Sequence, residues 1–468
     1  MTQTCPLRIW VNTFLCLPAV ASQGPSRPAF AAGIHWPAVH RSRWCVAATV
    51  TSITVRAPTS RRLPYLWDPP FAGRPSVPDP HDEDALATID VTSNPASQGR
   101  IIGVDVARAL AIFGMLAVHV GPTDAEGLTG RLYAAPHGRA SLLFVLLAGA
   151  GVIFMARSRR RSLSTTRWTL AWRAALLLPM GLVLQGLDHG ANVILQDYAV
   201  FFVLALLAIV VPARWLLGLA IGFATIGPII YLWFRGMFPD QFTRTAPALG
   251  DSTLEVAHRL VLSGPYPLIT WAAPFLFGMW LAHRDLGSVR IQQRMVVFGA
   301  TIGLGSLVLA RIALLVLGTP TSLSDPRFLL TSVAHGQMPL WLVGGTAVGV
   351  AVLGIALLTG SRFPRTVKPL ADVGQLALTV YVGHLLVLHA VPELATSDRV
   401  GGALTILATF AAVMLTCATL YRQRFARGPL ELVLHPGWLN TQQRTGTCAR
   451  SPANNVIPPR PHDVAPRA

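Results

Sequence analysis

Long apolar runs separated by short polar segments fill the chain between residues 100 and 435. The runs at 201–211 and 339–358 contain no charged residue. A run of about 18 or more apolar residues crosses a bilayer core of roughly 30 Å. The pattern predicts an all-α, polytopic integral membrane bundle of about ten transmembrane helices, at 101–121, 139–156, 168–187, 193–211, 214–234, 267–283, 295–317, 338–358, 370–390 and 400–420.

The two ends of the chain lack this pattern. Residues 1–98 are rich in Pro, Ser and Arg without a hydrophobic period, and residues 436–468 are polar, so both are predicted to be disordered tails. Residues 9–21 imitate the core of a signal peptide, and a start codon assigned too far upstream explains the same patchwork. The predicted membrane domain is 100–435, with no internal repeat and no clearly broken helix.

Composition agrees with a membrane protein. The chain is 52% hydrophobic and 13% charged, whereas soluble proteins carry about 25% charged residues. The formal net charge of +17 is almost entirely arginine, since Lys368 is the only lysine, a bias typical of a GC-rich bacterial genome. Because these arginines lie in short loops between apolar runs, we interpret them as membrane topology signals and expect no nucleic-acid partner. The five cysteines show neither metal-ligand nor disulfide-framework spacing, so no metal site is expected.

Loop arginines predict the orientation. If residue 100 is cytoplasmic, the inside loops hold fifteen Lys and Arg residues and the outside loops hold seven. This bias predicts a plasma-membrane protein with both termini in the cytoplasm. A cleaved signal peptide would invert every loop and is the alternative.

The first span contains three ionisable residues, Asp105, Arg108 and His119. Arg108 and His119 are eleven positions apart, which places them on one stripe of a helix, since eleven steps of about 100° return to within about 20° of the start. Asp105 lies one turn before Arg108, close enough to pair with it. Ionisable groups in a span usually face the bundle interior or a watery cavity. The alternative is that Asp105 and Arg108 mark one membrane interface and His119 the other.

Histidines gather on the predicted outer side. Besides His119, this side holds His137 and His384 with the nearby polar residues Asp197 and Tyr381. Histidine titrates near neutral pH and therefore serves where a proton must move. The cluster is a candidate site, although each single histidine also fits a loop or interface position, which we favour for His189 and His258.

Arg311 lies inside the apolar run at 295–317. An arginine near the middle of a span needs a partner or a cavity. Asp105, Asp197 or a bound anion are the candidate partners, and a span whose edge is shifted is the alternative. We assign Arg311, like Asp197, to substrate binding.

Several segments match family motifs. They are Arg100-Ile-Ile-Gly-Val-Asp105-Val-Ala-Arg108-Ala-Leu-Ala-Ile-Phe-Gly-Met, Ile194-Leu-Gln-Asp-Tyr198-Ala, Leu378-Thr-Val-Tyr381-Val-Gly-His384 and Arg427-Gly-Pro-Leu-Glu431. Together they resemble bacterial membrane proteins of the domain-of-unknown-function family 418. The chain is also similar to the catalytic domain of heparan-α-glucosaminide N-acetyltransferase. A more distant similarity is to the acyltransferase-three family, whose first helix carries an arginine, ten residues and a histidine, the spacing of Arg108 and His119.

The resemblance implies a transmembrane acyltransferase. An acyl group would pass from cytoplasmic acyl-CoA, with acetyl-CoA as the expected donor, to a hydroxyl or amine of a small-molecule or glycan acceptor on the far side. His119, or else His137, would act as general base or carry the acyl group transiently. Arg108, partnered by Asp105, would orient the site or bind anionic groups of the donor, and His384 and Tyr381 would line the acceptor side.

Two other functions fit the same residues. In a small-solute transporter, the polar groups would form a proton relay. In a structural or regulatory membrane protein, contacting only lipid, they could all be replaced freely.

Overall fold

The computed structural model describes residues 100–435 except 123–124, 159–161, 243–244, 323–324, 396 and 398. The predicted disordered tails and the arginine run at 159–161 lie outside the described residues. The helices are α1 (Ile102–Val120), α2 (Gly127–Tyr133), α3 (Arg139–Ala156), α4 (Leu163–Gln185), α5 (Leu195–Ala208), α6 (Ala213–Met237), α7 (Thr253–His258), α8 (Leu268–Leu281), α9 (Val289–Leu317), α10 (Pro339–Arg362), α11 (Lys368–Gln375), α12 (Ala377–Ala390), α13 (Val400–Arg424) and α14 (Pro429–Val433).

The predicted all-α membrane fold is confirmed. Within the described residues, seven helices are long and apolar enough to span a bilayer, and the number rises to nine if two bent helix pairs each count as one span. The secondary structure is helical throughout the described chain, apart from one isolated bridge between Leu249 and Asp251. Nine of the ten predicted spans each coincide with one helix and the span at 370–390 with the pair α11 and α12, although α5 has only 14 residues and is short for a span.

Two helix pairs are bent at a short break, and the second break falls inside a predicted span, which was expected to be unbroken. The π-helical turn at Arg259–Ser263 ends before α8 at Gly264, and prolines at 265 and 267 separate the segments, which are bent by 60°. The span predicted at 370–390 is broken into α11 and α12 by a bend of 80°. No proline lies at this second break. Instead Gly374 packs so closely on α1 that a Cβ there would lie 1.8 Å from the carbonyl oxygen of Asp105.

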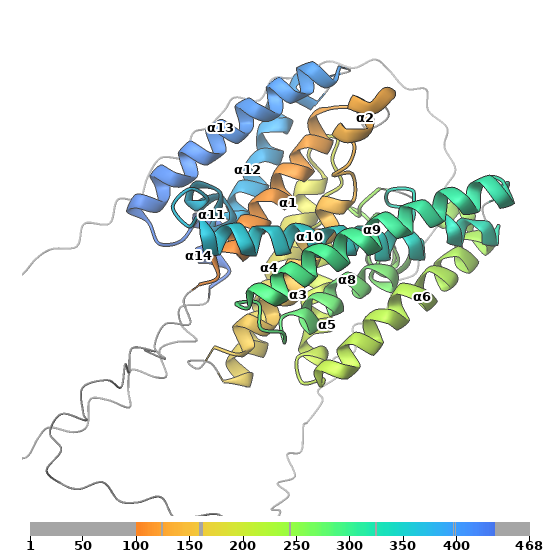
Figure 1. Ribbon diagram of the computed structural model, residues 1–468, viewed down its shortest axis with the longest axis horizontal. Helices are drawn as coiled ribbons and strands as arrows, with labels where there is room; N and C mark the ends of the chain where they lie inside the picture. Colours follow the sequence, from red (N-terminus) through yellow and green to blue (C-terminus); the bar gives the residue numbers. More distant parts are fainter. Residues whose placement is uncertain are drawn as a thin grey trace, which may run out of the picture. The chain divides into compact units, whose positions relative to one another are not determined.

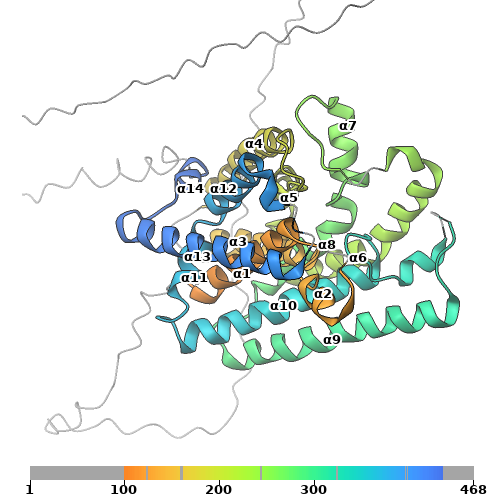
Figure 2. The ribbon, with the colours of Figure 1, turned by 90° about the horizontal axis from the view of Figure 1, so that it is seen from above.

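Two layers of helices surround α1 (Figures 1 and 2). One side holds α3, α8 and α10, with α9 lying along the outer face of α10, while α11, α12 and α13 lie on the other side. The α3–α8 contact is made by Gly149 and Gly278, each so close to the opposite helix that a Cβ would lie 2.0 Å from a backbone carbonyl oxygen. Small residues permit such close approach of membrane helices, where dispersion contacts replace the hydrophobic driving force.

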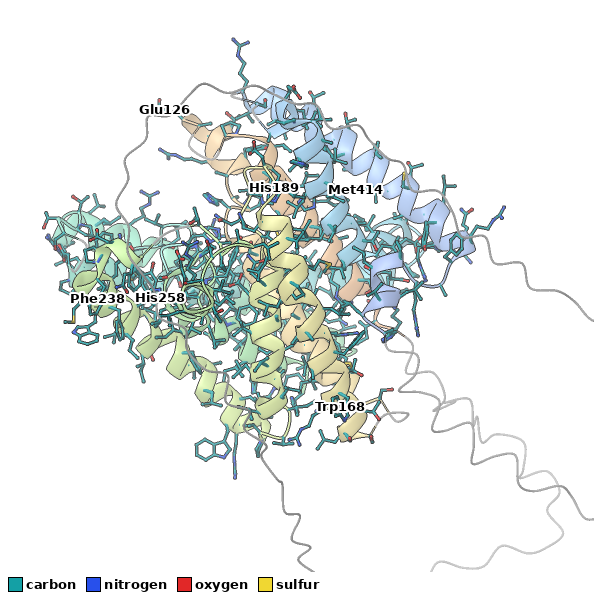
Figure 3. The ribbon with its side chains drawn as sticks, turned by 180° about the vertical axis from the view of Figure 1, so that it is seen from behind. Glu126, Trp168, His189, Phe238, His258 and Met414 are labelled. Atoms are coloured by element: carbon teal, nitrogen blue, oxygen red, sulfur yellow. The ribbon has the colours of Figure 1, made fainter. Side chains whose placement is uncertain are left out.

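The ends of the bundle differ in side chains. The helices α1, α4, α6 and α9 all begin at one end of the bundle. We name it the basic end, because arginines gather there in the loops. Three of these arginines lie over aromatic rings, in the pairs Arg214–Trp215, Arg284–Trp280 and Arg362–Phe363. We call the opposite end, which holds His137 and His189, the histidine end. Figure 3 shows Trp168 near the first end of α4 and His189 beyond its other end, on the same side as Glu126, which directly precedes α2.

Candidate functional site

The ionisable residues of α1 form a linked group. The Asp105 carboxylate is buried and accepts hydrogen bonds from Arg108 Nη1 at 2.8 Å and from Arg100 Nε at 2.5 Å. The expected pairing of Asp105 with Arg108 is thereby confirmed. Two guanidinium groups offset one buried carboxylate, which leaves this part of α1 with a net positive charge.

His119, in the last turn of α1, meets His384 of α12. Nδ1 of His119 lies 3.3 Å from Nε2 of His384, and the two rings are stacked with centroids 5.5 Å apart and planes 11° apart. One nitrogen must donate and the other accept, so the pair shares a proton whose position depends on the tautomers. His384 is buried, and its Nδ1 has no hydrogen-bond partner among the described residues.

Tyr381 lies one turn before His384 on the same face of α12. Its ring packs edge-on against His384, with centroids 5.1 Å apart. Its hydroxyl oxygen accepts a hydrogen bond from the backbone N–H of Ile194 at 3.2 Å, which fixes α12 against the start of α5. Tyr381 also stacks on Phe144 of α3 at 6.2 Å. The i, i+3 spacing in Leu-Thr-x-Tyr-x-x-His therefore places both polar groups on one surface.

Asp197 is a buried carboxylate in the first turn of α5. Only 1% of Asp197 is exposed, and neither carboxylate oxygen has a hydrogen-bond partner among the described residues. The hydroxyl of the neighbouring Tyr198 is equally without a partner there. Burying such groups unpaired is costly. This helix turn is thus a place where a water molecule, a proton or a ligand would be stabilised.

Arg311 is not brought to this group. It is exposed on α9, among the apolar side chains Leu307, Val308, Ile312 and Leu315 of its outer surface. The expected partners are engaged elsewhere or buried, because Asp105 pairs with Arg100 and Arg108, and Asp197 lies in the bundle interior. A single sequence gives the depth of Arg311 along its helix but not which face of α9 carries it.

His137 belongs to a second histidine pair. Its ring lies 5.5 Å from the ring of His335, with planes 54° apart. His335 also packs against Tyr266, Trp271 and Trp341. Burial lowers the pKa of His137, and the nearby Arg139 guanidinium lowers it further. His137 is therefore held neutral in an aromatic environment and is not joined to His119 by a hydrogen bond.

The loop that carries His335 is held in an unusual backbone conformation. His335 and Gln337 have φ values of 54° and 62°, in the left-handed region that side chains other than glycine rarely adopt. The buried amide of Gln337 stabilises this conformation. Its Oε1 accepts from Thr270 Oγ1 at 2.9 Å and from Trp271 Nε1 at 2.8 Å, and its Nε2 donates to the carbonyl of Pro265 at 2.9 Å.

The two remaining predicted loop histidines make local contacts. His189 lies 3.0 Å from the carbonyl oxygen of Leu184 through Nε2 and accepts from the N–H of Ala191 at Nδ1. Burial lowers the pKa of His189. His258 lies 2.9 Å from the hydroxyl of Ser263. His189 thus lies in a loop as expected, whereas His258 is the last residue of α7.

A cavity of about 300 Å³ leads from the basic end toward Tyr381. Its basic residues come from segments of the chain far apart in sequence, and aromatic rings form its inner part. Glu431 is the only acidic residue in its wall. The basic residues are Arg100, Arg108, Arg173, Arg427 and His435, and the aromatic ones are Phe144, Tyr198, Phe202 and Tyr381. This arrangement suits a ligand with an anionic part and an apolar part.

Sequence reasoning missed part of this wall. Arg173 lies inside the span predicted at 168–187, so the criterion that singled out Arg311 also applied to it. Glu431 follows the last span and carried no signal of burial. Only the fold brings these residues next to Arg108.

One family model matches the chain, over residues 280–439, and its description is "Protein of unknown function (DUF418)". We call the residues that this model matches the DUF418 region. The DUF418 region comprises α9 to α14, and so contributes Tyr381, His384 and Glu431, while Asp105, Arg108 and His119 precede it. A search of curated proteins found no match. The site therefore combines the DUF418 region with the preceding helices.

Proposed function

We propose that the protein is a transmembrane acyltransferase. The donor would be an acyl-CoA, with acetyl-CoA the simplest candidate, and the acceptor a hydroxyl or amine of a small molecule or glycan at the opposite membrane face. The observation that carries the proposal is the connection from a basic cavity, through Tyr381, to the His119–His384 pair. A phosphate-bearing donor and a proton-accepting group would then meet in one place.

The proposed orientation has the basic end in the cytoplasm of a plasma membrane, with both termini on that side. The loop arginine count supports this orientation. The cavity then opens toward cytoplasmic acyl-CoA.

In the proposed reaction, the acceptor oxygen or nitrogen attacks the thioester carbonyl carbon and the carbon–sulfur bond breaks. His119 accepts the acceptor's proton at Nε2 and passes the proton on its Nδ1 to Nε2 of His384. His384 in turn donates the proton on its unpartnered Nδ1 to the leaving thiolate. Arg108, held by Asp105, binds anionic groups of the donor. The geometry favours His384 over His137 as the partner of His119.

The test is acyl transfer in proteoliposomes. Labelled acetyl-CoA is supplied on the side of the basic end, with a panel of amino and hydroxyl sugars on the other. We expect label on an acceptor with wild type, none with His119→Ala, and wild-type transfer with His258→Ala, whose histidine makes a local contact. Transfer that survives in a His119→Ala, His384→Ala double variant would contradict the assignment.

Proton-coupled transport of a small solute is the second candidate. It is favoured by the two bent helix pairs and by the unpaired carboxylate of Asp197. Broken helices and intramembrane carboxylates are typical of transporters. Solute uptake driven by a pH gradient in the same vesicles, lost in Asp197→Asn and requiring no acyl-CoA, would replace the first proposal by this one.

A further inference from the structure

The break between α11 and α12 exposes backbone groups inside the bundle. A helix begins with four N–H groups that have no partner in the helix itself. At membrane depth, such groups must be satisfied within the protein. Since α12 carries Tyr381 and His384 within its first two turns, whatever binds its first turn also sets the position of these two side chains.

Glu431 binds the first turn of α12 from 50 residues further along the chain. Its Oε1 accepts hydrogen bonds from the N–H of Leu378 at 2.8 Å and from the N–H of Thr379 at 3.1 Å. Its Oε2 accepts from the hydroxyl of Thr379 at 2.5 Å. A carboxylate at a helix N-terminus is also favoured by the helix dipole. Glu431 is therefore an N-terminal cap supplied by a distant segment.

The other residues of Gly428-Pro-Leu-Glu431 serve the same contact. A Cβ at Gly428 would lie 2.0 Å from Glu431 Oε2 and 2.8 Å from Thr379 Oγ1, so only glycine leaves room for the carboxylate. Pro429 begins α14, where its fixed φ suits the first helical position. The N–H of Leu430 donates to Thr379 Oγ1 at 3.3 Å.

We propose that Glu431 is a positioning residue for the histidine pair. By capping α12, it sets the height and rotation of this helix, and thereby holds His384 at hydrogen-bond distance from His119 and Tyr381 at the inner end of the cavity. Its effect on catalysis rests on the proposed acyl transfer, whereas its effect on the geometry of the pair does not.

The primary test is nitrogen-15 magic-angle-spinning NMR of histidine-labelled protein in lipid bilayers. His119→Ala and His384→Ala assign the imidazole signals of the pair. In Glu431→Ala, we expect the signals of the shared hydrogen bond to shift to those of separate imidazoles. Glu431→Gln, which keeps an acceptor for the two N–H groups, should retain them largely. Leu432→Ala, an exposed residue of the same turn, is the matched control and should leave them unchanged.

Kinetics provide the second measurement. Glu431→Ala should lower kcat for acyl transfer by about tenfold or more, with partial rescue in Glu431→Gln. Unchanged imidazole signals in Glu431→Ala would overturn the proposal, even in a protein without acyltransferase activity. If Glu431→Ala does not fold, Thr379→Val decides: it removes the contacts of the hydroxyl with Oε2 and with the N–H of Leu430 and keeps the two N–H bonds to Oε1, and a spectrum identical to wild type would also overturn the proposal.

Discussion

Two histidine pairs in this molecule have the same ring separation and different environments. The His119–His384 rings and the His137–His335 rings both lie 5.5 Å apart. The two rings of the first pair are nearly parallel, and a nitrogen of one lies at hydrogen-bond distance from a nitrogen of the other. Tyr381, which packs against this pair, lines the basic cavity. The rings of the second pair are tilted by 54°, and its His335 packs against Tyr266, Trp271 and Trp341. Equal ring separation thus does not make the two pairs equivalent, because the first has two nitrogens at hydrogen-bond distance and a neighbour, Tyr381, in the cavity wall.

The largest expected effect is on the first pair. His119→Ala and His384→Ala should each lower kcat/KM for acyl transfer by about 100-fold or more, because the proton path loses a member. His137→Ala should retain activity within a few-fold. Initial rates in proteoliposomes at equal amounts of folded protein make the comparison. Equal losses in His119→Ala and His137→Ala would remove the distinction between the pairs.

The second effect concerns stability at the other pair. Gln337→Ala removes three buried hydrogen bonds and should destabilise the fold by about 3 kcal/mol, since it leaves buried partners unsatisfied. Thermal unfolding in detergent measures the change, with the exposed Gln241→Ala as control. Activity per folded molecule should persist. A normal melting temperature would mean that the left-handed loop is held by other contacts.

A smaller effect tests the link between the cavity and the first pair. Arg108→Ala should raise the KM for acyl-CoA about tenfold. Arg108→Lys keeps the charge but loses the planar donor geometry, so its KM should lie between those of wild type and Arg108→Ala. Arg311→Ala is the control, because this arginine is exposed on α9. Saturation curves for the donor distinguish the three variants. A rise in KM for Arg311→Ala equal to that for Arg108→Ala would show that the exposed Arg311 contributes to donor binding as much as Arg108 does.

The smallest effect is the pH dependence of stability at the second pair. The pKa of His137 is lowered in the folded state, so protonation favours unfolding. Its contribution to stability is complete above the unfolded pKa of about 6.5 and declines as the pH falls below that value toward the folded pKa. Melting temperatures of wild type and His137→Gln between pH 8 and pH 5 should converge as the pH decreases. Parallel curves would contradict the lowered pKa.

Hydrophobic patterning predicted where the helices lie, and the spacing of Asp105 and Arg108 predicted their pairing. It did not predict the break at Leu376 between α11 and α12, where the preceding Gly374 packs against the backbone of Asp105 in α1. His119 and His384 were both assigned to one end, but they are 265 residues apart, and only packing shows that they meet. Arg311 was misassigned because hydropathy gives depth and not the face of a helix.

The glycine contact between α3 and α8 has a consequence for how ligands exchange. Backbones that touch at Gly149 and Gly278 leave no room for sliding or rotation, so these two helices behave as a fixed frame. The opposite wall of the cavity is built from the kinked α11–α12 unit and the single turn of α14. Because α3 and α8 form a fixed frame, we expect the cavity to open by movement of the C-terminal helices. A cross-link between α12 and α14 should therefore trap a bound ligand. A cross-link between α3 and α8 should leave the ligand free to exchange.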